Sequence, residues 1–147
     1  MLHEQRLRRR PDWPTALQLF CTANSRRRFA WGEWDCCLFV ADAIEAMTGV
    51  DIASRFRGRY GTYREALMLI RMLCGDWPLE CVAARIAAEH GMAEIPVAQA
   101  QRGDMVLVNN GRRPVMGIVA LNGRELIVVS DRLARVPMSA ARRAWRV

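Results

Sequence analysis

Apolar residues recur every three or four positions through the first two thirds of the chain. This period is typical of amphipathic helices, and it predicts four of them, over residues 13–22, 35–48, 63–74 and 78–90. Asp12, Asp35 and Thr62 precede or open three of these segments, and all three are residue types that cap helix N-termini. Glycines follow three of the segments, where helices commonly end, at positions 49, 75 and 91.

From Pro96 onward the apolar pattern changes to that of short strands. Strands are predicted over residues 105–108, 116–121, 125–130 and 134–138, followed by a last helical turn over 139–143. Asn122-Gly123 is a strong hairpin signal between two of these strands. Helices followed by a small antiparallel sheet predict an α+β fold, with the N-terminal helices packed on a sheet formed by the C-terminal third. We expect a single domain over residues 1–147, in which residues 1–11 form a flexible basic arm.

The size and the cysteine content narrow the class of protein. The chain has 147 residues, 52% of them hydrophobic, and no apolar run reaches the roughly 18 residues that a membrane span needs. No apolar signal-peptide region follows the N-terminus. The five cysteines are an odd number and include an adjacent pair, which does not suit a disulfide framework. We therefore expect reduced thiols in a cytoplasm, and we predict no metal and no cofactor.

The net charge of +7 comes from 22 basic residues, every one of which is an arginine. The arginine clusters are scattered and are not interleaved with aromatic residues, so the pattern does not favour nucleic-acid binding. A solvated basic surface and docking onto acidic proteins both remain open. Arginine, tyrosine and tryptophan are common interface anchors, so the candidate partner-binding residues are Arg55, Arg57, Arg59, Tyr60, Arg142, Arg143 and Trp145. Asp42, in the middle of a predicted helix, is expected to pair with an arginine.

Cys36 is the candidate nucleophile. It stands at the start of a predicted helix, where the backbone N–H groups favour the thiolate. Asp35 either caps this helix or acts as an orienting acid, and the cap is preferred. Trp31 and Trp34 either line a groove beside Cys36 or pack in the core. Cys36 itself can instead be a small core residue, and without a base nearby this alternative is preferred.

A cysteine nucleophile also needs a proton shuttle, and the sequence holds only two histidines. His90 stands at a predicted helix end, where a charged imidazole is stabilised by the helix C-terminus, so it has a structural explanation. His3 lies in the basic arm. Either could be the base for Cys36 only if the fold brought it there.

The motifs around Cys36 resemble those of the NlpC-type, papain-like cysteine peptidases. Residues 35–40 match the family's Asp-Cys-Ser-Gly-Phe-Val signature, residues 103–107 match its Gly-Asp-strand signature, and residues 115–118 match its His-Val-Gly-Ile strand. The chain is most similar to small phage proteins of this superfamily that are encoded among tail-tip genes. It shares with them a Trp-Gly-x-x-Asp-Cys opening, Thr48-Gly49, an Arg-Gly-x-Tyr loop at residues 57–60 and the Ala-Trp-Arg-Val end.

The resemblance implies a papain-like fold in which Cys36 holds the nucleophile position and Val115 replaces the general-base histidine. The residue that orients the histidine would fall near Ser130. On this basis we expect a tail-tip or baseplate protein that has lost catalysis and binds neighbouring tail, hub or distal tail proteins. It would be made in the bacterial host cytoplasm and incorporated into the tail tip or an assembly intermediate. An active cell-wall peptidase acting on peptidoglycan is the alternative, and a nucleic-acid-binding module is a third hypothesis.

Overall fold

A computed structural model of the chain describes residues 7–75, 79–109, 111 and 113–147. Four helices come first: α1 (Trp13–Ala23), α2 (Cys36–Thr48), α3 (Tyr63–Cys74) and α4 (Leu79–Glu89). Six strands follow: β1 (Glu94–Ile95), β2 (Met105–Asn109), β3 (Pro114–Val119), β4 (Glu125–Val129), β5 (Leu133–Pro137) and β6 (Ala141–Trp145). The predicted α+β class is confirmed.

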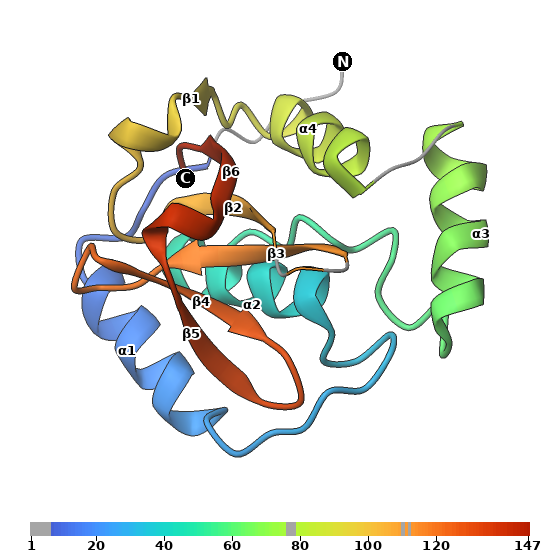
Figure 1. Ribbon diagram of the computed structural model, residues 1–147, viewed down its shortest axis with the longest axis horizontal. Helices are drawn as coiled ribbons and strands as arrows, with labels where there is room; N and C mark the ends of the chain where they lie inside the picture. Colours follow the sequence, from blue (N-terminus) through green and yellow to red (C-terminus); the bar gives the residue numbers. More distant parts are fainter. Residues whose placement is uncertain (1–6, 76–78, 110, 112) are drawn as a thin grey trace.

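The six strands form one antiparallel sheet in the order β1-β6-β2-β3-β4-β5. Successive side chains along its strands point to opposite faces of the sheet, and both faces are apolar. One face, which includes Leu107, Met116 and Ile118, packs against α2 in the main core, and the other buries a smaller cluster around Val106, Val108 and Val128. Helix α2 lies behind the middle of the sheet and α3 stands apart at the margin of the molecule (Figure 1). Among the described residues, no helix is both long and apolar enough to span a membrane.

The C-terminal segment differs from its prediction. A short 3-10 helix covers only Met138–Ala140, and residues 141–145, which were predicted to be partly helical, form strand β6. Strand β6 lies between β1 and β2, and β1 was not predicted. The physical reason is tertiary: β2 has an open edge on this side, and pairing with it buries Ala144 and Trp145.

The N-terminal predictions are also corrected in part. Residues 7–11 belong to the segment predicted to be a flexible arm, yet the backbone N–H of Arg10 donates to Met47 O at 2.8 Å and Arg9 pairs with Asp104. Asp12 precedes α1 as predicted, but its side chain makes no capping hydrogen bond. Residues 1–6 belong to the predicted arm and Pro78 to the predicted fourth helix, and these residues lie outside the described part of the chain.

Asp104 directly precedes β2 and forms several long-range polar contacts. Its carboxylate is fully buried. It accepts hydrogen bonds from the backbone N–H of Gln101 at 2.9 Å and that of Val147 at 3.2 Å. It also pairs with Arg9 at 2.8 Å and Arg146 at 3.1 Å. One carboxylate therefore joins the start of β2 to segments close to both ends of the chain.

Candidate active site around Cys36

Asp35 is the N-cap of α2. Its Oδ1 accepts from the backbone N–H groups of Cys37 and Leu38 at 3.1 and 3.0 Å, and its Oδ2 accepts from Gly32 N–H at 3.0 Å. The capping interpretation is therefore confirmed. The caps of α2 and α3 are both local features that the sequence predicted, since Thr62 also accepts from Glu65 N–H.

Tyr60 also binds the carboxylate that caps α2. Its hydroxyl donates a hydrogen bond to Asp35 Oδ2. Burial, followed by the neighbouring carboxylate, raises the pKa of Tyr60 far above its usual value, so the phenol stays protonated and remains a donor. Tyr60 was predicted to be a partner-binding residue. In the structure its hydroxyl is bonded to Asp35 and its side chain lines the cavity beside Cys36.

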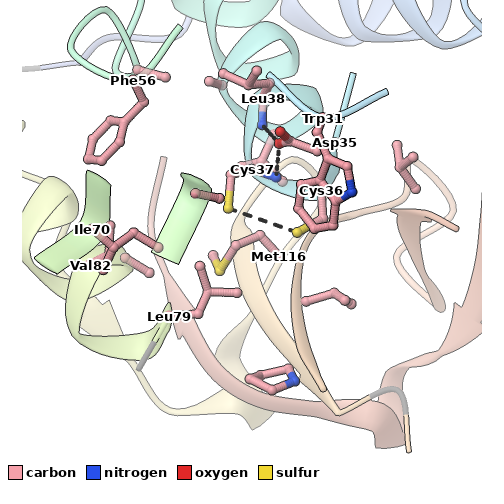
Figure 2. Close-up of a pocket in the computed structure, with 18 of the residues that line it drawn as sticks. Trp31, Asp35, Cys36, Cys37, Leu38, Phe56, Ile70, Leu79, Val82 and Met116 are labelled. Carbon is pink, nitrogen blue, oxygen red and sulfur yellow. Dashed lines mark hydrogen bonds between the residues drawn. The ribbon is translucent and has the colours of Figure 1, made fainter. Parts of the chain in front are cut away.

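The two adjacent thiols have different environments. Cys36 Sγ and Cys37 Sγ lie 3.9 Å apart (Figure 2). The pKa of Cys36 is lowered, because it accepts a hydrogen bond from the Cys37 thiol and a further one from the Met116 backbone N–H, and these outweigh burial. The pKa of Cys37 is raised well above its ordinary value by donating to Cys36 and by burial. Of the two thiols, Cys36 is therefore the more readily deprotonated.

A cavity of about 630 Å³ opens beside the thiols. It is bounded by the start of α2, the loop that contains Ile52 and Phe56, helices α3 and α4, and the sheet. Its walls are overwhelmingly apolar, and polar side chains reach it at only a few points, among them Tyr60, Arg113 and Ser130. Ile70, Leu79 and Val82 face the thiols from the opposite side in Figure 2.

No histidine of the described residues lines this cavity. His90 follows the last residue of α4, and its Nδ1 is hydrogen-bonded to Ile86 O at 2.9 Å, which is the structural role considered for it. His90 is therefore not placed as the base for Cys36. His3 lies outside the described residues.

Val115 and Met116 are consecutive residues of β3, so their side chains point to opposite faces of the sheet. Val115 pairs with Val108 and packs against the smaller cluster, although it also borders the cavity. Met116 pairs with Leu107 on the face toward α2, and its side chain points toward the two sulfur atoms in Figure 2. Met116, which sequence reasoning missed, is thus the β3 side chain that faces Cys36. Strand alternation from the buried Ile118 could have indicated it.

Of the other predicted cleft residues, two lie at the cavity and one lies in the core. Trp31 lines the cavity and contacts the Tyr63 ring, with centroids 5.5 Å apart. Trp34 is fully buried between Phe20 and Phe39, so its cleft assignment was wrong and the core interpretation holds. Ser130 is exposed at the rim of the cavity, and its hydroxyl accepts from the Asp131 N–H.

Most of the predicted partner-binding side chains are engaged within the chain. Trp145 is 1% exposed, so it is a core residue and its assignment as an interface anchor was wrong. Arg57 pairs with Asp42 at 2.7 Å, as expected for Asp42, and also with Asp51. Arg55 and Arg143 pair with Glu89 and Glu94. Arg59 and Arg142 are exposed, and Arg142 donates to nearby backbone carbonyls.

A family model matches residues 8–147, nearly the whole chain. The protein belongs to the DUF6950 family, a domain family of unknown function. No curated protein matches the chain. The described residues include no group of three or more acidic, histidine or cysteine side chains that could hold a metal ion.

Proposed function

We propose that this DUF6950 protein is a structural or assembly protein of a phage tail tip or baseplate. Its fold would be a papain-like, NlpC-type fold that has lost its catalytic dyad. The observation that supports the proposal is the composition of the site: Cys36 stands at the start of a capped helix, as the nucleophile of this family would, but no imidazole of the described residues lines its cavity. Val115, at the position that would match the family's histidine, is apolar; it packs on the other face of the sheet while bordering the cavity.

The chemistry of the cavity supports binding over hydrolysis. Peptide-bond cleavage requires a proton for the leaving amine, and loss of a general acid–base costs about 10²–10⁴-fold in rate. Cys37 is the nearest donor to Cys36, but it is a thiol of raised pKa that already donates to Cys36. The cleft instead offers a largely apolar surface, which is suited to holding a neighbouring tail, hub or distal tail protein.

The second candidate is a cell-wall cysteine peptidase used in phage entry. It is favoured by the lowered pKa of Cys36, which is what a cysteine nucleophile needs. This function would require a base from outside the cavity as described, such as a partner chain. A nucleic-acid-binding module has less support, because several of the arginines in its clusters are paired with carboxylates.

The test compares three phages: wild type, a Cys36→Ala variant and one whose gene carries an early stop codon. We expect the variant to form infectious particles at wild-type yield and the truncated gene to leave tails incomplete. Normal infectious particles without the protein would overturn the assembly function. Purified wild-type protein should also release no peptide fragments from peptidoglycan. Release that Cys36→Ala abolishes would establish the peptidase instead.

A further inference from the structure

Helix α3 presents an apolar stripe that the described residues cover only in part. Tyr63, Ala66, Leu67 and Ile70 recur at helical spacing and all line the cavity, yet no residue of α3 is buried. An amphipathic helix gains its stability by burying such a stripe against another element. Here the space between the stripe and the protein body is the 630 Å³ cavity itself.

The border of this cavity is basic. Arg113 lines it and lies over the Tyr63 ring, with its guanidinium carbon 4.0 Å from the ring centroid. Arg64 and Arg71 are exposed and seven residues apart, so they lie along one border of the α3 stripe, next to Leu67. Glu65 lies on the side of the helix away from the apolar stripe. An occupant with acidic residues beside its apolar side chains would match this arrangement.

The lining also restricts the backbone of the occupant. An extended peptide buried here would leave its N–H and C=O groups facing apolar walls, and each unpaired group costs about 1–3 kcal/mol. A helix satisfies these groups internally and presents only side chains, which is how apolar grooves receive amphipathic helices.

We infer that the cavity and the α3 stripe form a docking groove for an amphipathic helix of a partner protein, with apolar residues facing the cavity and acidic residues facing Arg64, Arg71 and Arg113. That the partner is a phage tail protein rests on the proposed function. The predicted chemistry of the docked segment is independent of that proposal.

The test places the photo-crosslinking residue p-benzoylphenylalanine at one of two adjacent positions of the full chain, in cells producing the phage. Leu67 lines the groove, while Met68 is 57% exposed on the outward side of α3 and is the matched control. We expect a cross-link from position 67 and little from position 68. Mass spectrometry should map the cross-link to an amphipathic helix bordered by aspartate or glutamate.

The cross-linking result can overturn the docking groove and the tail function independently of each other. A cross-link to such a helix in a protein that is not a tail component would keep the groove and overturn the tail function. No cross-link from position 67, equal cross-links from both positions, an adduct with lipid alone, or a basic or extended partner segment would overturn the groove.

Two charge variants provide a second measurement. Arg71→Glu changes only the rim and should reduce the cross-link from position 67 by about two- to fivefold, as expected for one exposed ion pair. Leu67→Glu should abolish co-purification of the cross-linked partner, while Met68→Glu should not. Thermal unfolding of both glutamate variants checks that the fold is intact. Full binding by a folded Leu67→Glu protein would contradict the inference.

Discussion

The hydroxyl of Tyr60 donates a hydrogen bond to the carboxylate of Asp35, 25 residues earlier in the chain. The same carboxylate caps α2 and thereby positions Cys36 at the first turn of that helix. The Arg-Gly-x-Tyr loop and the Asp-Cys motif, which the resemblance treated as separate signatures, are therefore two parts of one site. Asp35 is 2% exposed, so its carboxylate depends on these donors in place of water.

Replacing Asp35 by alanine should lower the free energy of unfolding by about 2 kcal/mol or more. Loss of an N-cap costs about 1 kcal/mol, and a partly buried Tyr60 hydroxyl left without its acceptor adds about 1–3 kcal/mol. Urea denaturation measures the change. Asp12→Ala is the control, because Asp12 precedes α1 but makes no capping hydrogen bond, and it should change stability by less than about 0.5 kcal/mol. Equal effects would contradict the role given to Asp35.

Alkylation by iodoacetamide should distinguish the two adjacent thiols. A lowered pKa means that the Cys36 thiolate persists to lower pH, whereas the raised pKa of Cys37 keeps that thiol protonated. In Cys37→Ser protein we expect Cys36 to react at a lower pH than an ordinary cysteine does. In Cys36→Ser protein Cys37 should react only at alkaline pH. Peptide mass spectrometry follows each site.

A further variant tests the cause of the lowered pKa. Cys37→Ala removes the thiol that donates to Cys36, so the reaction of Cys36 should shift to higher pH than in Cys37→Ser, where a hydroxyl can donate instead. If Cys37 reacts before Cys36, or if both serine variants behave alike, the assigned hydrogen bond is wrong.

A histidine introduced on β3 should affect Cys36 only from the correct face of the strand. Met116→His places an imidazole on the face toward α2, so it should pair with Cys36 and increase its alkylation rate near neutral pH. Val115→His is the matched control on the opposite face and should leave the rate near that of the wild type. A larger effect from Val115→His would contradict the assignment of Met116 as the β3 side chain that faces Cys36.

Asp104→Ala should be among the more destabilising single substitutions. It leaves Arg9 and Arg146 without their carboxylate and removes the acceptor of two backbone N–H groups. Both guanidinium groups are partly exposed, so water reduces the penalty to about 2 kcal/mol, below the 3–5 kcal/mol typical of a fully buried pair. Differential scanning calorimetry measures it. Arg28→Ala breaks a pair of exposed side chains 3.9 Å apart and should change the stability by less than about 0.5 kcal/mol. A comparable loss of stability from both substitutions would contradict the role of Asp104 in joining β2 to segments near both ends of the chain.

Local signals in the sequence determined the helices well. The cap of α2 at Asp35, the capping box at Thr62 and the glycines after α2 and α3 each act within a few residues, and Gly49 and Gly75 have φ angles of 80° and 74°. The positions of β2, β3 and β4 followed for the same reason, since an apolar run between turn residues is also a local feature. The position of Cys36 at a helix start was likewise anticipated.

Only the tertiary structure decided which side chains meet. Pairing with β2 made a strand of residues 141–145, and burial turned Trp34 and Trp145 from candidate binding residues into core residues. The same long-range contacts put Met116, and not Val115, against Cys36, joined Tyr60 to Asp35, and left the α3 stripe facing a cavity. These outcomes depend on free energy gained between segments far apart in the chain, and a local pattern of apolar and polar residues does not specify them.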